Sequence, residues 1–408
     1  MMPGDVSDQP INSAINLTSG RFWGRNPHAE LAWMRENCPV YWDPSGAVWG
    51  ASTYFEIKQV SRRPDLFCSG EGIRPDADRM PMMIDMDDPE HKLRRKLVSA
   101  GFTPRRVSGR RAYLERVCDE IIDKVCEQGE CDLVADLAAQ LPLIVIGDAL
   151  GFEPEDRQSL LKWSDDMLSA LTGGDDPALI EDAAEAFARF NDHTAHVIAD
   201  RRRCPHDDLI STLIDSRVDG SHLDQDSLLV ELLLILIGGD ETTRHVISGG
   251  AWQLFLHPEQ RRRLTGDLAL IPTAVEEMLR WVSPIKNMAR TATRDTRLNG
   301  RTIHEGDKLL LLYPSANRDA LVFADPGTFD IGRSPNEHLA FGNGPHFCLG
   351  NSLARLEMTV MFEKLLTRLP DIEPVDRQEP AYRPANFVSG YETMPVRFTP
   401  TRRSGATA

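Results

Sequence analysis

The sequence predicts a mainly α-helical protein with small β-sheets. Segments with helical spacing follow one another from residue 90 to 202, a long apolar helix is expected over 227–256, and short strand patterns occur near both ends of the chain. A chain of 408 residues can bury a large core, and no linker or internal repeat divides it. We therefore expect a single domain over residues 21–400, a flexible N-terminal tail over 1–20 and a C-terminal tail over 401–408.

The first part of the chain predicts a helix, a hairpin and a long loop. Asn26 and Pro27 suit the N-cap and first-turn positions of a helix. Residues 38–52 alternate weakly around the turn sequence Asp43-Pro44-Ser45-Gly46, which predicts a β-hairpin. Proline, glycine and aspartate are frequent over 63–89, so we expect a long loop there, and loops of that length in compact domains are usually functional.

Turn-forming sequences divide the rest of the chain. The helices expected between 90 and 202 are separated by breaks at Thr103-Pro104, Glu127–Gly129 and Thr172–Pro177. Strands are expected around Leu298-Asn299-Gly300 and over Lys308–Leu312, and a helix over Asn351–Leu369.

Composition and charge exclude several classes of function. With 46 basic against 62 acidic residues the net charge is −16, which argues against nucleic acid or an anionic membrane as the main partner, because both require a cationic surface. The seven cysteines are an odd number without C-x-x-C spacing, so we expect no disulfide framework or zinc site, and a reducing cytoplasm suits them. Met1–Asn16 lacks the apolar core of a signal peptide, and the longest apolar run, Leu228–Ile237, carries Glu231 and is too short for a transmembrane segment.

The most specific motif surrounds a single cysteine. Residues Phe341–Gly350 read F-G-N-G-P-H-F-C-L-G, in which three glycines and a proline around Cys348 predict a tight loop whose backbone can approach a flat ligand closely. The helix expected after this loop places the thiol near a helix N-terminus, where amide groups favour a thiolate. The alternative is a structural cysteine buried in a turn.

A second motif interrupts the long apolar helix. Gly238 and Gly239 weaken a helix by about 1 kcal/mol each, so a buried pair suggests that something approaches the backbone there. Thr242 can donate to the carbonyl of Gly238, which would bend the helix and open a notch lined by Glu241 and Thr242. The alternative is a helix kink with a satisfied threonine.

Together these motifs resemble the cytochrome P-450 family. In that family the cysteine of F-G-x-G-x-H-x-C-x-G is the axial thiolate ligand of haem iron, which implies metal binding by Cys348 and haem contacts from Phe341 and Gly350. The segment Gly238–Thr243 is similar to the family's oxygen-binding segment, with glycine where alanine is commoner at the first position. The resemblance implies the cytochrome P-450 fold, with haem b between the long central helix and the helix after the cysteine loop.

The resemblance also implies a buried ion network. Glu277 and Arg280 match the family's E-x-x-R pair, and Arg333 matches the third member, an arginine nearer the cysteine. We expect a structural role for these residues. The alternative is a solvated surface pair, which contributes little to stability.

Haem propionates need cationic partners in a protein interior. The segment Asp88–Arg95 resembles the family's D-P-x-H-x-x-x-R, whose histidine and arginine reach a propionate, so His91 and Arg95 are candidates. By the same resemblance Arg290 and His346 are candidates. The alternative for each residue taken alone is an exposed base.

The implied activity is that of a haem–thiolate monooxygenase. A thiolate ligand favours O–O cleavage, and Glu241 and Thr242 are expected to manage proton delivery, so that one oxygen atom of O2 enters a substrate C–H bond. No Rossmann or flavin motif is visible, so the resemblance implies electrons from NAD(P)H through a reductase and a ferredoxin. Basic residues over 92–111 would attract an acidic ferredoxin if they lie beside the cysteine loop, and a solvated helix face is the alternative.

The substrate pocket is expected from less regular segments, and its residues are mostly apolar, which suits a large apolar molecule. They are Ile73, Met82, Met83, Leu234, Gly238, Val282, Ile285, Phe387 and Val388. Over these segments the chain resembles the actinobacterial cholesterol side-chain hydroxylases, which implies hydroxylation of a terminal side-chain methyl (carbon 26 or 27) of cholesterol or cholest-4-en-3-one, and further oxidation to the acid. Another lipid, a terpenoid or a macrolide is the alternative substrate. A non-catalytic haem–thiolate sensor would keep Cys348 but needs neither Glu241 nor Thr242.

Overall fold

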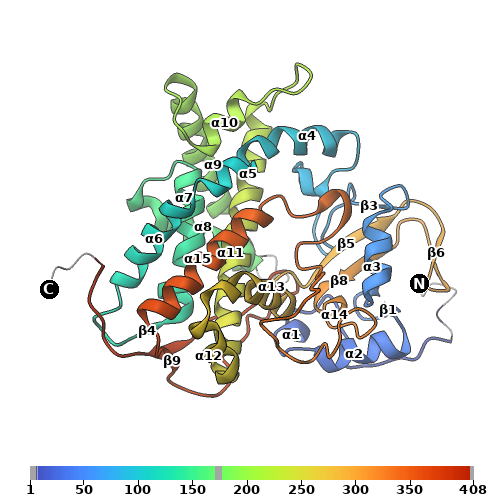
Figure 1. Cartoon of the computed structure of the whole chain (residues 1–408). Helices are drawn as coiled ribbons and strands as arrows, with labels where there is room; N and C mark the ends of the chain where they lie inside the picture. Colours follow the sequence, from blue (N-terminus) through green and yellow to red (C-terminus); the bar gives the residue numbers. More distant parts are fainter. Residues whose placement is uncertain (1–5, 7, 171–176, 405–408) are drawn as a thin grey trace.

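The computed structural model describes residue 6, residues 8–170 and residues 177–404, and it confirms a mainly helical protein with small sheets (Figure 1). The helices are α1 Gly20–Trp23, α2 His28–Asn37, α3 Tyr54–Ser61, α4 Glu90–Val98, α5 Pro104–Ser108, α6 Arg111–Asp123, α7 Gln140–Ala149, α8 Arg157–Ala170, α9 Pro177–Arg203, α10 Leu209–Asp215, α11 Gln225–Leu256, α12 Pro258–Gly266, α13 Ile271–Val282, α14 Tyr313–Ala316 and α15 Asn351–Arg368. The strands are β1 Val40–Asp43, β2 Val48–Ala51, β3 Phe67–Cys68, β4 Glu130–Asp132, β5 Asn287–Ala292, β6 Thr296–Leu298, β7 Arg301–Ile303, β8 Lys308–Leu312, β9 Glu373–Pro374 and β10 Pro395–Arg397.

The largest sheet of the described residues lies to one side of the helices, in the order β1-β2-β8-β5-β3 (Figure 1). β2 and β8 pair in parallel, and the other neighbours pair antiparallel. Because successive side chains of a strand point to opposite faces, the continuous apolar run of β8 serves two cores. Leu309 and Leu311 join one apolar cluster, and Leu310 and Leu312 join the cluster on the other face.

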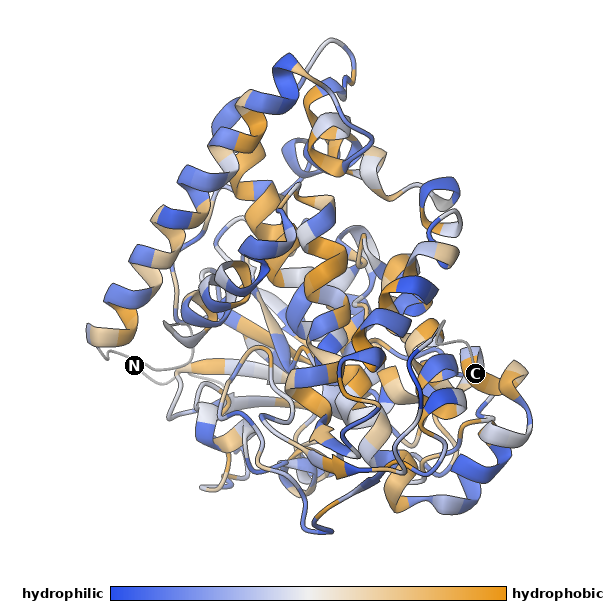
Figure 2. Ribbon diagram, turned by 90° about the vertical axis from the view of Figure 1, so that its left-hand side faces the viewer, coloured by the Kyte–Doolittle hydropathy of each residue, from blue (hydrophilic) through white to orange (hydrophobic). Residues whose placement is uncertain are grey.

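α11 runs through the middle of the helical part and packs against α7, α13 and α15 (Figure 1). It begins where the Asp224 side chain accepts a hydrogen bond from the Ser227 N–H at 2.8 Å, and it ends before Pro258. The interior helices carry the most hydrophobic segments, whereas peripheral helices show alternating hydrophilic and hydrophobic stripes (Figure 2). A central apolar helix of this length can therefore present one stripe to a ligand and still be held by protein elsewhere.

Most elements expected from the sequence are present. The hairpin at 38–52 is β1 and β2, with Trp42 paired to Trp49, and the turn at Asn299-Gly300 joins β6 to β7. The loop expected over 63–89 holds β3 and one short 3-10 turn, Met83–Asp85. The break at Thr172–Pro177 lies largely outside the described residues.

The predicted start of the first helix is wrong by one residue. Asn26 adopts a left-handed φ of 57°, and Pro27 occupies the N-cap position of α2. Asparagine tolerates this conformation better than most residues. Asn26 therefore forms the turn before the helix instead of capping it.

The expected N-terminal tail is wrong for part of its length. Ile15 and Leu17 are 2% and 0% exposed, and the Leu17 N–H donates to Asp43 at 2.6 Å. Gln9 also donates to the carbonyl of Trp42 at 2.8 Å. The polar composition of this segment hid its two buried anchors, which join the core beneath β1 and β2.

The C-terminal segment is also attached over its described part. The Thr401 N–H donates to the carbonyl of Cys126 at 2.8 Å, and Ser404 bonds to Asp123. Among the described residues, no helix is long and apolar enough to cross a membrane.

Candidate active site

One stripe of α11 is less covered by protein than the rest of the helix. Gly238 is exposed and Leu234 and Thr242 are partly exposed, although the helix around them is largely buried. Of the described residues, none has a heavy atom within 4 Å of the place where a Cβ on Gly238 would stand. A Cβ on Gly239 would instead meet Ile146 of α7 at 2.6 Å. The glycine pair therefore serves two purposes, because Gly239 admits α7 and Gly238 leaves space for a ligand.

The predicted bond from Thr242 is present. Its Oγ1 donates to the carbonyl of Gly238 at 2.8 Å. The helix nevertheless continues without interruption from Gln225 to Leu256, so the expected opening of the backbone ladder is wrong. The space comes from the missing side chain of Gly238 and not from a break in the helix.

The cysteine loop leads directly into α15, which packs against α11. Gly342 and Gly344 have φ angles of 71° and 75°, which L side chains rarely adopt. The Cys348 N–H donates to the carbonyl of Phe341 at 2.9 Å and closes the loop. Of the expected ligand-facing glycines, Gly350 has open space at its Cβ position, whereas Gly344 packs tightly on the backbone of Ser61.

The thiol of Cys348 has the surroundings of a metal ligand. Burial raises its pKa, and hydrogen bonds from the Gly350 and Asn351 amides together with the charges of Arg95 and Arg355 act in the opposite direction. These groups stabilise a thiolate once a metal cation replaces the proton. The guanidinium of Arg355 also stacks on Phe341, 4.4 Å from the ring centroid.

Four basic side chains gather beside the cysteine loop. The rings of His91 and His346 stack with centroids 4.1 Å apart, and Arg95 donates to the carbonyl of Phe347. Arg290 is buried and donates to the carbonyl of Ala289 at 2.7 Å. Burial and the charges of Arg290, His91 and Arg95 lower the pKa of His346 to about 2.

The arrangement of these four basic side chains suits an anion. The Nε2 atom of His91 is buried and has no hydrogen-bond partner among the described residues. The guanidinium charges of Arg95 and Arg290 both act on His346, and charges of the same sign in a protein interior are stabilised by an anion among them. The two propionates of a haem between Gly238 and Gly350 would supply that charge, so the residues present fit the group.

Glu241 does not line the open stripe. It is 0% exposed, and its carboxylate accepts from Arg244, lies 3.2 Å from His245 Nε2 and accepts from Arg383 at 3.1 Å. Burial alone would raise its pKa, but the hydrogen bond with His245 and the charges of Arg244 and Arg383 outweigh burial and hold the pKa well below its ordinary value. The predicted notch lined by an acid and an alcohol is therefore correct for Thr242 and wrong for Glu241.

The partners of Glu241 were not predicted. Arg244 and Arg383 also reach Asp165 of α8, at 3.4 and 3.5 Å, so the network joins α8, α11 and the C-terminal loop. The neighbouring Asp240 is buried, and burial together with the Glu241 charge raises its pKa to about 7. Adjacent acids in an apolar helix were the available signal, but no local pattern indicated Asp165 or Arg383.

The E-x-x-R pair is buried, and the surface alternative is wrong. Glu277 and Arg280 are both 0% exposed and share two hydrogen bonds of 2.7 Å. Arg333 donates to Glu277 at 3.1 Å. Arg280 also donates to the carbonyls of Asn317, Pro326 and Thr328, so the pair holds the segment that leads into the cysteine loop.

The expected substrate residues fall into two apolar groups joined by Ile84. Met82, Met83 and Leu234 belong to one group, and Ile73, Ile285, Phe387 and Val388 belong to the other. Ile285 and Val388 form a β-bridge, and the Ala289 N–H donates to the carbonyl of Ile73 at 2.7 Å. Val282 was assigned wrongly, because it packs in the main core against Gly249.

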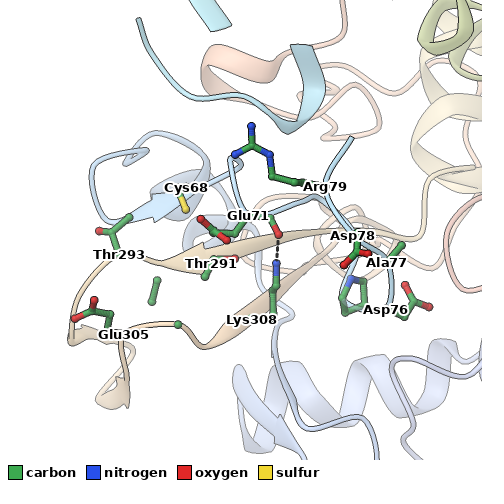
Figure 3. Close-up of a pocket in the computed structure, with 13 residues that line it drawn as sticks. Cys68, Glu71, Asp76, Ala77, Asp78, Arg79, Thr291, Thr293, Glu305 and Lys308 are labelled. Carbon is green, nitrogen blue, oxygen red and sulfur yellow. Dashed lines mark hydrogen bonds between the residues drawn. The ribbon is translucent and has the colours of Figure 1, made fainter. Parts of the chain in front are cut away.

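A surface cleft of about 1110 Å³ lies elsewhere, between the 68–79 segment and β5 (Figure 3). Acidic residues and Arg79 surround it, and Lys308 donates to the backbone carbonyl of Glu71 across it (Figure 3). None of the predicted site residues lines this cleft. It is therefore separate from the space between α11 and the cysteine loop.

Comparison with known proteins gives a consistent result. The family model described as Cytochrome P-450 matches residues 158–390. The chain is 52% identical to a steroid C26-monooxygenase of Mycobacterium tuberculosis, over 95% of this chain and 98% of that protein. It is 38% identical to a methyl-branched lipid omega-hydroxylase of Mycobacterium bovis, over 94% and 95% of the two chains. The crystal structure of CYP109E1 from Bacillus megaterium with testosterone superposes with a TM-score of 0.84 at 31% identity, covering 91% of this chain and 99% of that one.

Proposed function

The chain belongs to the cytochrome P-450 family and is a haem–thiolate monooxygenase, and on that premise we propose that it hydroxylates a terminal methyl group of a sterol side chain. The observation that carries the proposal is the 52% identity to a steroid C26-monooxygenase, which extends over 95% of this chain. The segments around Met82, Leu234 and Phe387, which form the apolar groups near α11, are among those that resemble the sterol hydroxylases.

The chain's own residues provide the haem site. Cys348 would supply the thiolate, and His91, Arg95, Arg290 and His346 would hold the propionates. When bound, haem iron with a thiolate ligand supplies the reductive activation of O2. Gly238 and Gly350 have open space at their Cβ positions, which would admit a flat group.

Thr242 can orient a water molecule. Its hydroxyl faces the open stripe and is polarised by the Gly238 carbonyl, so it can accept from a water and keep that water oriented. Glu241 is held as a carboxylate by three basic side chains. Proton transfer through Glu241 therefore requires one of these ion pairs to loosen first.

The apolar pocket suits a substrate without charge at its reacting end. Leu234, Met82 and Met83 belong to the apolar cluster that includes α11, and Ile73, Ile285 and Phe387 belong to a second cluster that meets the first at Ile84. Because Gly238 has no side chain, a narrow aliphatic end can lie closest to α11. A sterol that enters with its side chain first presents such an end.

Electrons come from a ferredoxin reduced by NAD(P)H through a reductase. Arg95 of α4 contacts the Phe347 carbonyl, so the start of the basic segment 92–111 adjoins the cysteine loop, and Arg111 of α6 pairs with Glu363 farther along α15. An acidic iron–sulfur protein would dock there with a short path to Cys348.

The test combines binding and turnover. Cholest-4-en-3-one is expected to shift the ferric haem-loaded enzyme to high spin, and a surrogate ferredoxin and reductase are expected to give the terminal alcohol. Thr242→Ala should keep the spin shift but divert electrons to hydrogen peroxide, a result that a non-catalytic sensor would not give. A methyl-branched fatty acid is the rival substrate, because a relative at 38% identity is a methyl-branched lipid hydroxylase. If that acid shifts the spin state and the sterol does not, the sterol proposal is wrong.

A further inference from the structure

One acidic residue lies within the apolar first half of α11. Glu231 is 0% exposed and stands seven residues before Gly238. Seven residues correspond to about two turns of an α-helix, so both residues lie on nearly the same stripe. A buried carboxylate is costly unless it is paired and hydrogen-bonded. Its presence beside the substrate pocket therefore needs a reason.

Glu231 fastens the methionine-rich loop segment, residues 80–86, to α11. Its Oε1 accepts from the Met83 backbone N–H at 2.8 Å and from Arg94 of α4 at 3.3 Å. Met83 begins a short 3-10 turn, and the first amides of such a turn have no partner within it. The carboxylate supplies that partner from another element.

The rest of the segment is fastened within the loop and to the cysteine loop, where the Met86 backbone bonds with His346. Asp85 accepts from the backbone N–H groups of Ile73 and Met80, at 2.9 and 2.8 Å, within the same long loop. These bonds fix the shape of the loop but not its distance from α11. That distance is set where Met83 meets Glu231.

Methionine makes the backbone anchor necessary. Met82 and Met83 belong to the same apolar cluster as Leu233 and Leu236 of α11, and unbranched thioether side chains adapt to many shapes. A pocket wall made of these two methionines cannot keep a fixed pocket width by side-chain packing alone. A hydrogen bond from the Met83 backbone to α11 can fix that width.

We propose that Glu231 is a positioning residue that sets substrate specificity, because it holds the Met82–Met83 wall at a fixed distance from α11. A rigid, bulky substrate depends on that distance, whereas a small ligand at the iron does not. The choice of a sterol as the bulky ligand rests on the proposed function. The anchor, which is the hydrogen bond from the Met83 N–H to Glu231, does not depend on that function.

The anchor is tested without substrate by hydrogen exchange. In Glu231→Leu, the amides of residues 80–86 are expected to exchange at least tenfold faster, because Met83 loses its acceptor. Glu231→Gln retains a carbonyl oxygen and should restore most of the protection. Amides of β8 serve as the internal control, since they pair in the sheet. Unchanged exchange over 80–86 in Glu231→Leu would overturn the anchor.

Specificity is tested by comparing two ligands. The dissociation constant of cholest-4-en-3-one should rise about tenfold in Glu231→Leu, that of imidazole should stay unchanged, and Glu231→Gln should recover sterol binding. Equal changes for both ligands would overturn the specificity role. If Glu231→Leu does not fold, Arg94→Gln removes the second partner of the same carboxylate and should weaken sterol binding in the same selective way. If the wild-type protein does not bind cholest-4-en-3-one, the proposed function is contradicted instead. The hydrogen-exchange experiment would still test whether Glu231 anchors residues 80–86.

Discussion

At the scale of single residues, the surroundings of each buried carboxyl decide whether it is charged. Burial raises the pKa of Glu357 to about 8, because the charge of Arg110 only partly offsets the loss of water. Glu276, on α13, is also desolvated, but its hydrogen bonds with His338 and Arg355 lower its pKa to about 2. The pKa values of two chemically identical groups are therefore shifted in opposite directions.

Glu357→Gln is expected to flatten the dependence of stability on pH. The folded-state pKa of Glu357 lies above the ordinary glutamate value of 4.5, so the unfolded chain loses its proton first as pH rises. Stability from this group is therefore complete below about pH 4.5 and falls by up to about 1.4 kcal/mol per pH unit until the pH passes the folded value. Thermal unfolding between pH 5 and 8 should show a smaller loss of Tm in Glu357→Gln. The exposed Glu155→Gln is the control, and equal slopes in wild type and Glu357→Gln would contradict the assignment.

At the scale of elements, α13 determines how the cysteine loop is supported. Its inner face carries Glu277 and Arg280, and Arg333 from the following segment completes the network. Removing one partner of a buried ion pair leaves an uncompensated charge in the interior. The supporting segment would then lose its hydrogen bonds together with the charge balance.

Glu277→Ala is expected to destabilise the protein by about 3–5 kcal/mol. The matched control is Glu276→Ala on the same helix, whose side chain is 28% exposed and whose loss can be offset by water. Urea unfolding of the two variants measures the difference in stability. Haem retention measures whether the segment held by Arg280 and Arg333 still supports the cysteine loop. Equal destabilisation by the two variants would mean that helix propensity, and not the buried network, accounts for the effect.

Sequence reasoning reached the parts of the site that depend on local spacing. The closed cysteine loop, the bond from Thr242 to Gly238 and the Glu277–Arg280 pair all join residues that are near one another in the chain. It failed where the partner comes from a remote segment. Arg383 reaches Glu241 from far along the sequence, and no spacing pattern encodes that approach.

At the scale of the whole molecule, the charge distribution is uneven. The net charge is −16, yet Lys92, Lys96 and Arg105 are exposed on the segment that adjoins the cysteine loop. Other basic residues of that segment are already held in ion pairs, such as Arg94 with the buried Glu231 and the exposed Arg111 with Glu363. Lys92, Lys96 and Arg105 are therefore the residues most available to an acidic partner.

Reduction by a ferredoxin should therefore depend on these exposed charges and on salt. Lys96→Glu and Arg105→Glu each place a negative charge where an acidic partner would dock, so the second-order rate of reduction at low ionic strength should fall about tenfold. Lys124→Glu, on the exposed residue after the far end of α6, changes the net charge equally and should leave the rate nearly unchanged. Raising the ionic strength should slow the wild type and bring it toward the two docking variants, because screening removes the attraction that those variants already lack. A wild-type rate that is independent of salt, or an equal loss in Lys124→Glu, would show that net charge or another face governs electron delivery.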